Sequence, residues 1–174
     1  ATEPYYANTN VWRRPSDLDI IDQANFLDSL NWPTKNRYVI VFNEMNRFDE
    51  WGGRAPSPEE YAEVLMYTND VFKRRNPDFY IIMGGLDNAA PNDGKHLSYA
   101  QYLERMYAHN NDVFNKMDGF SSHSYPNPGF VAAPGVGRMS VGTYKYEYDY
   151  INPRASSKKL AFITETGWDS AILG

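Results

Sequence analysis

The sequence contains no cysteine, no long apolar segment and no strong excess of charge. Without cysteine, a disulfide scaffold, a thiolate zinc site and a cysteine nucleophile are all excluded. No apolar run approaches the roughly 18 residues that a membrane-spanning helix requires. The 17 basic and 22 acidic side chains leave a weakly acidic chain, which argues against nucleic acid or an anionic membrane as a partner.

Low-complexity segments, charge blocks, linkers and sequence repeats are also missing, so we expect a single domain covering residues 1–174. The chain begins at Ala1 without an initiator methionine or a signal peptide. We interpret this as either a processed start or a segment of a longer protein. The lack of cysteine suits a secreted or cell-surface protein of bacterial type, which is the location we predict.

The hydrophobic pattern predicts helices and strands in alternation. A serine precedes most of the apolar stripes with helical spacing, and short β-branched or aromatic runs stop at glycine or polar residues. The tyrosines of residues 143–151 alternate as in a strand, but the order of elements favours a helix there. The predicted helices cover 16–30, 57–75, 98–107 and 143–151, and the predicted strands cover 38–42, 79–83, 119–122 and 160–164. Such alternation indicates a parallel sheet.

Two of these strands stop at a glutamate, Glu44 in the first and Glu165 in the last. Their apolar runs predict strands that helices cover on both faces. In parallel α/β folds, ligands bind at the carboxyl ends of the strands, so the two glutamates can face each other across a cleft. A glycosidase needs such a pair, because one carboxylic acid protonates the leaving oxygen while one carboxylate attacks the sugar.

Three motifs in the same chain order resemble those of the clan A glycoside hydrolases, which are retaining glycosidases built on a (β/α)8 barrel. Asn43-Glu44 looks like the pair that ends the fourth barrel strand in that family. Glu165, within Thr-Glu-Thr-Gly-Trp, looks like the nucleophile that ends the seventh strand. His123-Ser124-Tyr125 is similar to the His-x-Tyr near the end of the sixth strand in cellulase-like members.

The resemblance implies a role for each of these residues. Glu44 would be the acid/base, Glu165 would be the nucleophile, and the Tyr125 hydroxyl would bond the nucleophile. The substrate would be a β-linked polysaccharide or oligosaccharide, and no metal or organic cofactor would be needed. The alternative is a non-catalytic carbohydrate-binding or structural barrel fragment, because a fold does not guarantee an activity.

The resemblance extends from the end of the third barrel strand through the seventh. A complete barrel takes about 250 residues. The expected fold class is therefore α/β, a partial TIM barrel with about four complete strands. Open strand edges invite pairing with other chains, so we expect another segment or a second copy to supply the missing strands.

Some candidate residues have two interpretations each. Glu44 alone would be a surface carboxylate at a strand end, and Asn43 is either a turn former or a ligand of the sugar 2-hydroxyl. His123 is either a structural residue or a substrate contact. Within the family motifs, we favour the functional interpretation of Glu44 and Asn43, and we leave His123 open.

Aromatic residues on loops after strand ends are candidates for stacking on the C–H face of a sugar. Trp168 and Trp51 are the two such candidates, whereas Trp12 and Trp32 flank a helix and suit packing. The loop over residues 87–94 contains Asp and Asn side chains, but it lacks the spacing of a calcium loop. We therefore interpret it as a solvated turn.

Overall fold

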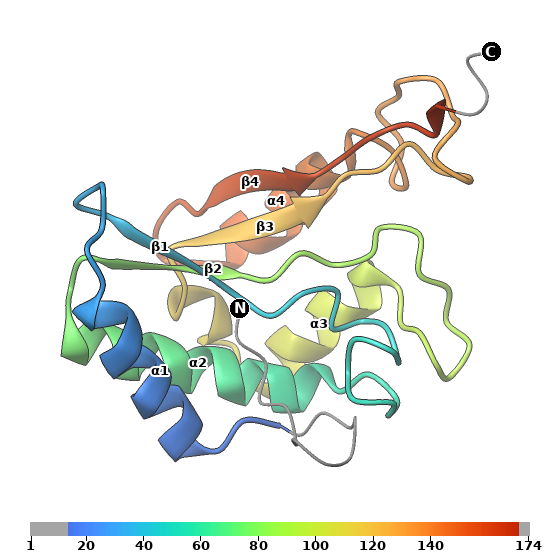
Figure 1. The fold of residues 1–174 in the computed structure, drawn as a ribbon. Helices are drawn as coiled ribbons and strands as arrows, with labels where there is room; N and C mark the ends of the chain where they lie inside the picture. The colour runs from blue at the N-terminus through green and yellow to red at the C-terminus, as the bar shows by residue number, and fades with distance from the viewer. Residues whose placement is uncertain (1–13, 171–174) are drawn as a thin grey trace.

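The computed structural model describes residues 14–170, so the prediction for Trp12 lies outside the described residues. Strands and helices alternate along this part of the chain (Figure 1). The strands are β1 (Arg37–Val41), β2 (Phe79–Met83), β3 (Gly119–His123) and β4 (Leu160–Glu165). The helices are α1 (Asp17–Ser29), α2 (Pro58–Arg75), α3 (Tyr99–His109) and α4 (Thr143–Ile151), with short 3-10 turns η1 (Val113–Asn115) and η2 (Asn152–Arg154). None of the described helices is both long and apolar enough to cross a membrane.

All the strands of the described sheet are parallel, and they lie in the order β1-β2-β3-β4. Each strand therefore pairs with the next one along the chain, with a helix between them. This confirms the predicted α/β fold with four parallel strands alternating with helices. Within the described residues, β1 and β4 are the outer strands of the sheet.

Three helices begin at serines that the sequence identifies. Ser16, Ser57 and Ser98 each accept a hydrogen bond from the backbone N–H three residues further on. These bonds satisfy N–H groups that have no partner within the helix. At Gly142, which precedes α4, no side chain caps the helix. The helical conformation of α4 confirms the prediction made from the order of the elements.

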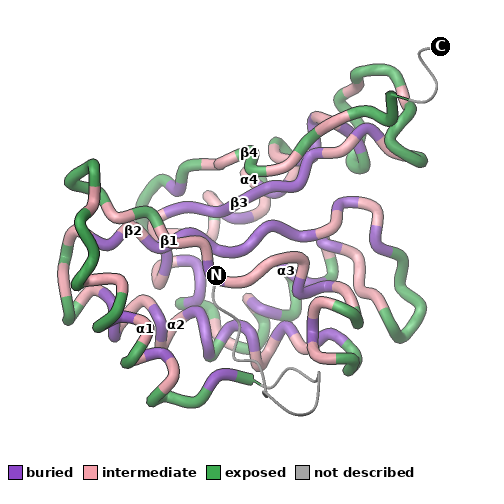
Figure 2. The backbone as a smooth tube through the Cα atoms, in the orientation of Figure 1, coloured by how far each residue is buried: buried purple, intermediate pink, exposed green. Residues whose placement is uncertain are grey.

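The helices pack side by side, α1 on α2, α2 on α3 and α3 on α4, while α2 and α4 pack on the strands (Figure 1). Buried apolar side chains such as Ile81 and Phe120 lie in the core. Figure 2 shows β3 buried throughout, whereas β4 is partly exposed. The prediction that helices cover β1 and β4 on both faces is wrong for the described residues, because Tyr38 of β1 and Leu160 and Ile163 of β4 are exposed.

The rings of Tyr38, Tyr80 and Phe162 contact one another across the sheet. Strand alternation puts them on the opposite face from Ile81, which belongs to the core. Tyr38 is exposed, so this second face of the sheet is not covered by the described residues. We call it the open face.

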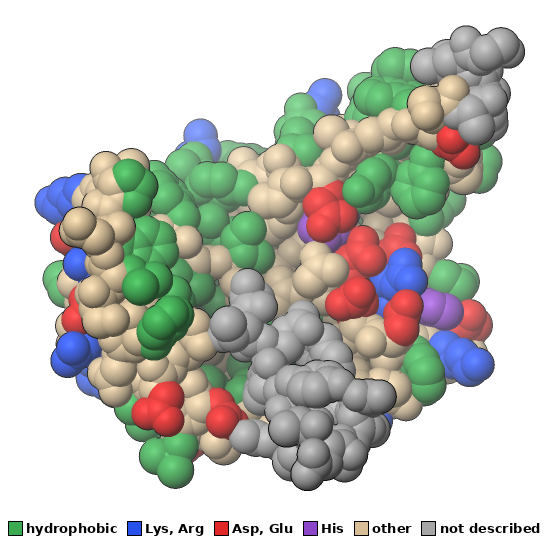
Figure 3. All heavy atoms as spheres, in the orientation of Figure 1, with side chains coloured by type: hydrophobic (Ala, Val, Ile, Leu, Met, Phe, Trp, Pro, Cys, Tyr) green, Lys and Arg blue, Asp and Glu red, His purple; other side chains and the backbone are tan. Residues whose placement is uncertain are grey.

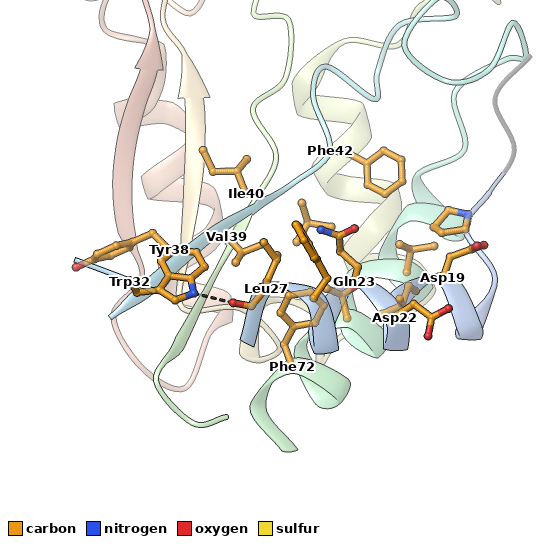
Figure 4. Close-up of a pocket in the computed structure, with 16 residues that line it drawn as sticks. Asp19, Asp22, Gln23, Leu27, Trp32, Tyr38, Val39, Ile40, Phe42 and Phe72 are labelled. Carbon is orange, nitrogen blue, oxygen red and sulfur yellow. Dashed lines mark hydrogen bonds between the residues drawn. The ribbon is translucent and has the colours of Figure 1, made fainter. Parts of the chain in front are cut away.

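A cavity of about 760 Å³ lies between α1 and the outer edge of β1 (Figure 4). Leu27, Val39 and Phe72 are among its lining residues. Trp32 closes one end, where its indole N–H donates a hydrogen bond of 2.7 Å to the Leu27 carbonyl. Trp32 also packs edge-on against Phe79, as expected for a packing residue.

Candidate active site

The chain turns sharply where β1 ends. Phe42 and Glu44 have φ angles of 68° and 37°, in the left-handed region that non-glycine residues rarely adopt. The Glu44 N–H donates a hydrogen bond of 2.8 Å to the Gly85 carbonyl, which holds this segment against the end of β2. Backbone strain of this kind persists only where surrounding structure enforces it, and it concentrates at functional sites.

A β-bulge changes the register at the ends of β3 and β4. Ser122 lies opposite Ile163, but the next residue, His123, lies opposite Glu165, so Thr164 is skipped. The Ser124 N–H then donates a hydrogen bond of 3.0 Å to the Glu165 carbonyl. Bulges re-aim side chains. This one brings His123 and Glu165 to the same level of the sheet.

The structure brings four of the predicted residues together at these strand ends. His123 Nδ1 lies 2.9 Å from Glu44 Oε1 and 3.4 Å from Glu165 Oε2. The Tyr125 hydroxyl donates a hydrogen bond of 3.2 Å to Glu165 Oε2. The imidazole of His123 is buried, whereas the side chains of Glu44 and Glu165 are 15% and 40% exposed. Acidic side chains gather beside a histidine on this face of the molecule (Figure 3).

The His123 ring depends on the absence of a side chain at Gly85. A Cβ atom at position 85 would lie 2.3 Å from His123 Cδ2 and 2.4 Å from Nε2. These distances are far below van der Waals contact, so only glycine leaves room for the ring in this position. From the sequence alone, Gly85 indicates only that the preceding strand ends, and its contact with His123 is not predictable.

Arg47 is a site residue that the motifs do not reveal. Its guanidinium group lies 3.6 Å from Glu44 Oε2 and 3.4 Å from Asp87 Oδ2, and it pairs at 2.8 Å with Asp49. Hydrogen bonding to Arg47 lowers the pKa of Asp49. Arg47 therefore places a positive charge beside Glu44. Its position three residues after Glu44 is the one signal that the sequence offers.

Asn43 lies between Glu44 and a further carboxyl group, that of Glu50. Partial burial raises the pKa of Glu50, and a hydrogen bond with the Asn43 side chain opposes this rise. The negative charges of Asp49 and Glu44 raise the pKa further. Asn43 thus has a protein partner at the edge of the acidic cluster. Glu50 is a second neighbour that sequence reasoning missed.

The two candidate tryptophans have different surroundings. Trp51 is only 4% exposed, and its ring packs against Phe42 and Tyr61 in the core. A buried ring cannot stack on a sugar, so the structure does not bring Trp51 to the site. Trp168 is 46% exposed, and its indole N–H donates a hydrogen bond of 3.0 Å to the Ala132 carbonyl.

The loop over residues 87–94 supports the site. Asp87 pairs with Arg47, and the buried Asn88 amide donates to the Tyr125 carbonyl at 2.9 Å. Asn88 also donates to Thr143 Oγ1 at 2.9 Å, at the start of α4. The loop thus fixes the backbone of Tyr125.

Within residues 14–170, Glu44, His123 and Glu165 form a group whose geometry could hold a metal ion, because one ligand atom from each lies within 4.8 Å of the others. His123 Nδ1 is hydrogen-bonded to Glu44 and lies within ion-pair distance of Glu165. What remains is a pair of carboxyl groups whose oxygens converge on one side of a histidine. Such a pair can act together on the two atoms of one substrate bond, one group as an acid and the other as a nucleophile or base.

No family model and no curated protein sequence matches this chain. Solved structures with a similar fold include CelM2 and AbfB. The crystal structure of CelM2, a bifunctional glucanase-xylanase from a metagenome library, matches with a TM-score of 0.61 and 15% identity over 92% of this chain and 41% of that chain. AbfB, a family 51 α-L-arabinofuranosidase from Bifidobacterium longum, matches with a TM-score of 0.50 and 15% identity over 78% of this chain and 28% of that chain.

The chain therefore spans less than half the length of either structure. At this level of identity, the comparisons establish the fold alone. They show that the four strands and their helices match part of the barrel of glycoside hydrolases.

Proposed function

We propose that this chain is the part of a retaining glycoside hydrolase that carries both catalytic carboxyl groups. One observation carries the proposal: Glu44 and Glu165, from opposite edges of the sheet, place carboxylate oxygens within 4.8 Å of each other. Retaining enzymes hold these groups about 5–5.5 Å apart, and inverting enzymes hold them about 6.5–9.5 Å apart. The similarity to glycoside hydrolase barrels supports the same assignment.

In the proposed mechanism, Glu165 attacks the anomeric carbon while Glu44 protonates the leaving oxygen. Glu44 then accepts a proton from water as that water releases the sugar from Glu165. Glu165 must be ionised to attack, and its Oε2 atom accepts the hydrogen bond from the Tyr125 hydroxyl. The substrate class is a β-linked polysaccharide or oligosaccharide.

The surrounding residues would position the sugar. Asn43 sits beside Glu44 and can bond the 2-hydroxyl group, an interaction that strengthens in the transition state. His123 orients Glu44 through the hydrogen bond at its Nδ1 atom. The exposed ring of Trp168 is available for stacking on a sugar. The buried Trp51 has no place in this proposal.

A second candidate is a carbohydrate-binding fragment without turnover. The observation that favours it is the exposure of the proposed nucleophile, since 40% of the Glu165 side chain is exposed. Catalysis at a carboxylate pair depends on excluding water around the charges. An exposed nucleophile suits binding better than hydrolysis.

The two candidates separate in one assay of the purified protein with aryl β-glycosides, β-glucans, xylans and mannans. We expect hydrolysis with retention of configuration, and we expect Glu165→Gln to abolish it. Glu44→Gln should spare the first step for aryl glycosides with good leaving groups, which need little protonation. Glu63→Gln, at a half-exposed surface position, is a matched control that should leave activity unchanged. Sugar binding without turnover by the unmodified protein would favour the second candidate.

A further inference from the structure

His123 and the two site carboxyl groups place three potential metal ligands close together. Nδ1 of His123 lies 2.9 Å from Glu44 Oε1 and 3.4 Å from Glu165 Oε2, and an oxygen of each carboxyl group lies within 4.8 Å of the other. The ligands of a tetrahedral zinc ion, bound at about 2.0–2.2 Å, are about 3.3–3.6 Å apart. Both distances from the imidazole ring are close to this spacing, so the main adjustment is a closer approach of the two carboxyl groups.

The ends of three strands hold these ligands. Glu44 follows β1, and its N–H donates a hydrogen bond of 2.8 Å to the Gly85 carbonyl. His123 ends β3, where its buried ring occupies the space that a Cβ atom at position 85 would take. Glu165 ends β4, at the bulge. Because the backbone of each ligand is fixed, a cation meets a nearly formed site and does not have to order it.

Each carboxyl group also has an outer partner. The Tyr125 hydroxyl donates to Glu165 Oε2 at 3.2 Å. Arg47 lies 3.6 Å from Glu44 Oε2, which is not the oxygen that faces His123. Carboxyl groups that bind metals are usually oriented by such outer partners. The surroundings therefore suit metal binding as well as hydrogen bonding.

Arg47 carries a positive charge that opposes a cation beside Glu44. Its guanidinium group lies nearer to Asp49, at 2.8 Å, and to Asp87, at 3.4 Å. Carboxyl groups outside the ligand set thus offset much of this charge. Glu44 and Glu165 then supply the two negative charges that balance a divalent cation.

The kinds of donor atom in this group favour zinc over calcium or magnesium. Imidazole nitrogen and carboxylate oxygen both bind Zn²⁺, whereas Ca²⁺ and Mg²⁺ take oxygen ligands and need roughly six or more of them. Three protein ligands are enough for Zn²⁺ when water takes the fourth position. The Glu165 side chain is 40% exposed, so solvent reaches this side of the group.

We propose that Glu44, His123 and Glu165 form a Zn²⁺ site, with His123 Nδ1, one oxygen from each carboxyl group and one water as ligands. Zinc binding and glycoside hydrolysis exclude each other, because a carboxyl group that binds the ion can neither donate a proton nor attack a sugar. This exclusion rests on the proposed function, whereas the binding of zinc does not. The ion is therefore an inhibitor of the proposed reaction and not its cofactor.

The chain has three histidines, and the other two can be removed to isolate the site. His96 and His109 each lie near a carboxyl group, at 3.0 Å from Asp93 and 3.3 Å from Glu63. In His96→Ala/His109→Ala protein, calorimetric titration with ZnCl₂ should show one ion per chain, and millimolar CaCl₂ should not displace it. Adding His123→Ala should weaken zinc binding at least about hundredfold, since the loss of an outer partner alone costs about 10–100-fold.

Nitrogen-15 NMR of the His123 ring in the same background identifies the ligand atom. The Nδ1 resonance should move more than the Nε2 resonance when zinc is added. The inference is overturned if the folded protein binds no zinc or if His123→Ala leaves the affinity unchanged. If His123→Ala does not fold, Glu44→Gln and Glu165→Gln take its place. Each should weaken binding at least about tenfold, and unchanged affinity in both again overturns the inference.

Hydrolysis assays separate this inference from the proposed function. A zinc-free protein that does not hydrolyse glycosides but binds zinc through His123 contradicts the proposed function alone. Full hydrolytic activity of the zinc-saturated protein overturns the inference, because carboxyl groups held by the ion cannot act on a sugar.

Discussion

Gly85 illustrates at the scale of single residues how little free space the site contains. A Cβ atom there would overlap the His123 ring, so Gly85→Ala must displace that ring. We expect a loss of about 1–3 kcal/mol in the free energy of unfolding, as for other overpacked positions. If the protein is a hydrolase, its kcat should fall at least about tenfold, since small misplacements of catalytic groups are costly.

The measurements are urea denaturation and steady-state kinetics. Gly137→Ala is the matched control, because a Cβ atom there meets nothing within 4 Å. Equal stability and activity for both variants would show that His123 is not held as the structure places it.

The raised pKa of Glu147, a buried residue of α4, makes the free energy of unfolding depend on pH. Its pKa is about 7 in the folded protein, against 4.5 as the ordinary value. Because folding raises this pKa, the contribution of Glu147 to stability is full below pH 4.5 and is lost as the pH rises through 7. The loss amounts to about 3 kcal/mol.

Glu147→Gln removes this titration. The free energy of unfolding should therefore fall less for the variant than for the unmodified protein between pH 5 and pH 8. Urea denaturation at both pH values measures the difference. Parallel pH profiles for the two proteins would contradict the burial of an ionisable group at this position.

Single residues also show what a sequence can reveal about a site. Glu44, Glu165 and Tyr125 were accessible because each belongs to a short motif at the end of an apolar run. Arg47 and Glu147 were not, because their importance comes from contacts between segments that lie apart in the chain. The polar loop around Trp51 did not show whether its ring turns inward.

At the scale of elements, one hydroxyl group holds two strand ends together. Tyr61, in α2, donates a hydrogen bond of 2.8 Å to the Val41 carbonyl and accepts one of 2.9 Å from the Gly84 N–H. These groups are buried, so Tyr61→Phe leaves both backbone groups unpaired. We expect a cost of about 1–3 kcal/mol.

The free energy of unfolding, measured by urea denaturation, tests this expectation. Tyr67→Phe in the same helix is the control. A change of less than a few tenths of a kcal/mol for Tyr61→Phe would mean that β1 and β2 hold their ends together without it.

The elements themselves were predictable because each helix or strand has local signals, such as the serine caps and the β-branched runs. The helix at residues 143–151 was predictable only from its place in the alternation, since its tyrosines repeat every second residue. The exposure of β4 was not predictable, because a strand's own residues do not show whether it lies at an edge.

At the scale of the whole molecule, the described sheet has two outer strands and an open face. β1 borders the cavity beside α1, and Ile163 of β4 is exposed. Apolar strand edges invite pairing with further strands. We therefore expect this chain to associate, with a second copy or another segment covering these edges.

Light scattering on the 174-residue chain tests this expectation, and we expect a species of at least two chains. Val39→Lys should reduce association, because it places a charge in the cavity beside β1. Lys158→Gln, at an exposed position before β4, is a control that should leave association unchanged. A stable monomer that unfolds cooperatively would contradict the expectation.

The bulge at Thr164 affects which amino acids β4 can carry on each side of it. Under strict alternation from Phe162, Thr164 would share its face and Glu165 would point toward the helices. The bulge shifts the alternation of side chains between the two faces of the sheet by one position for the residues that follow it. Residues before it can therefore vary to suit the packing, and residues after it can vary to suit the chemistry, without either set dictating the other.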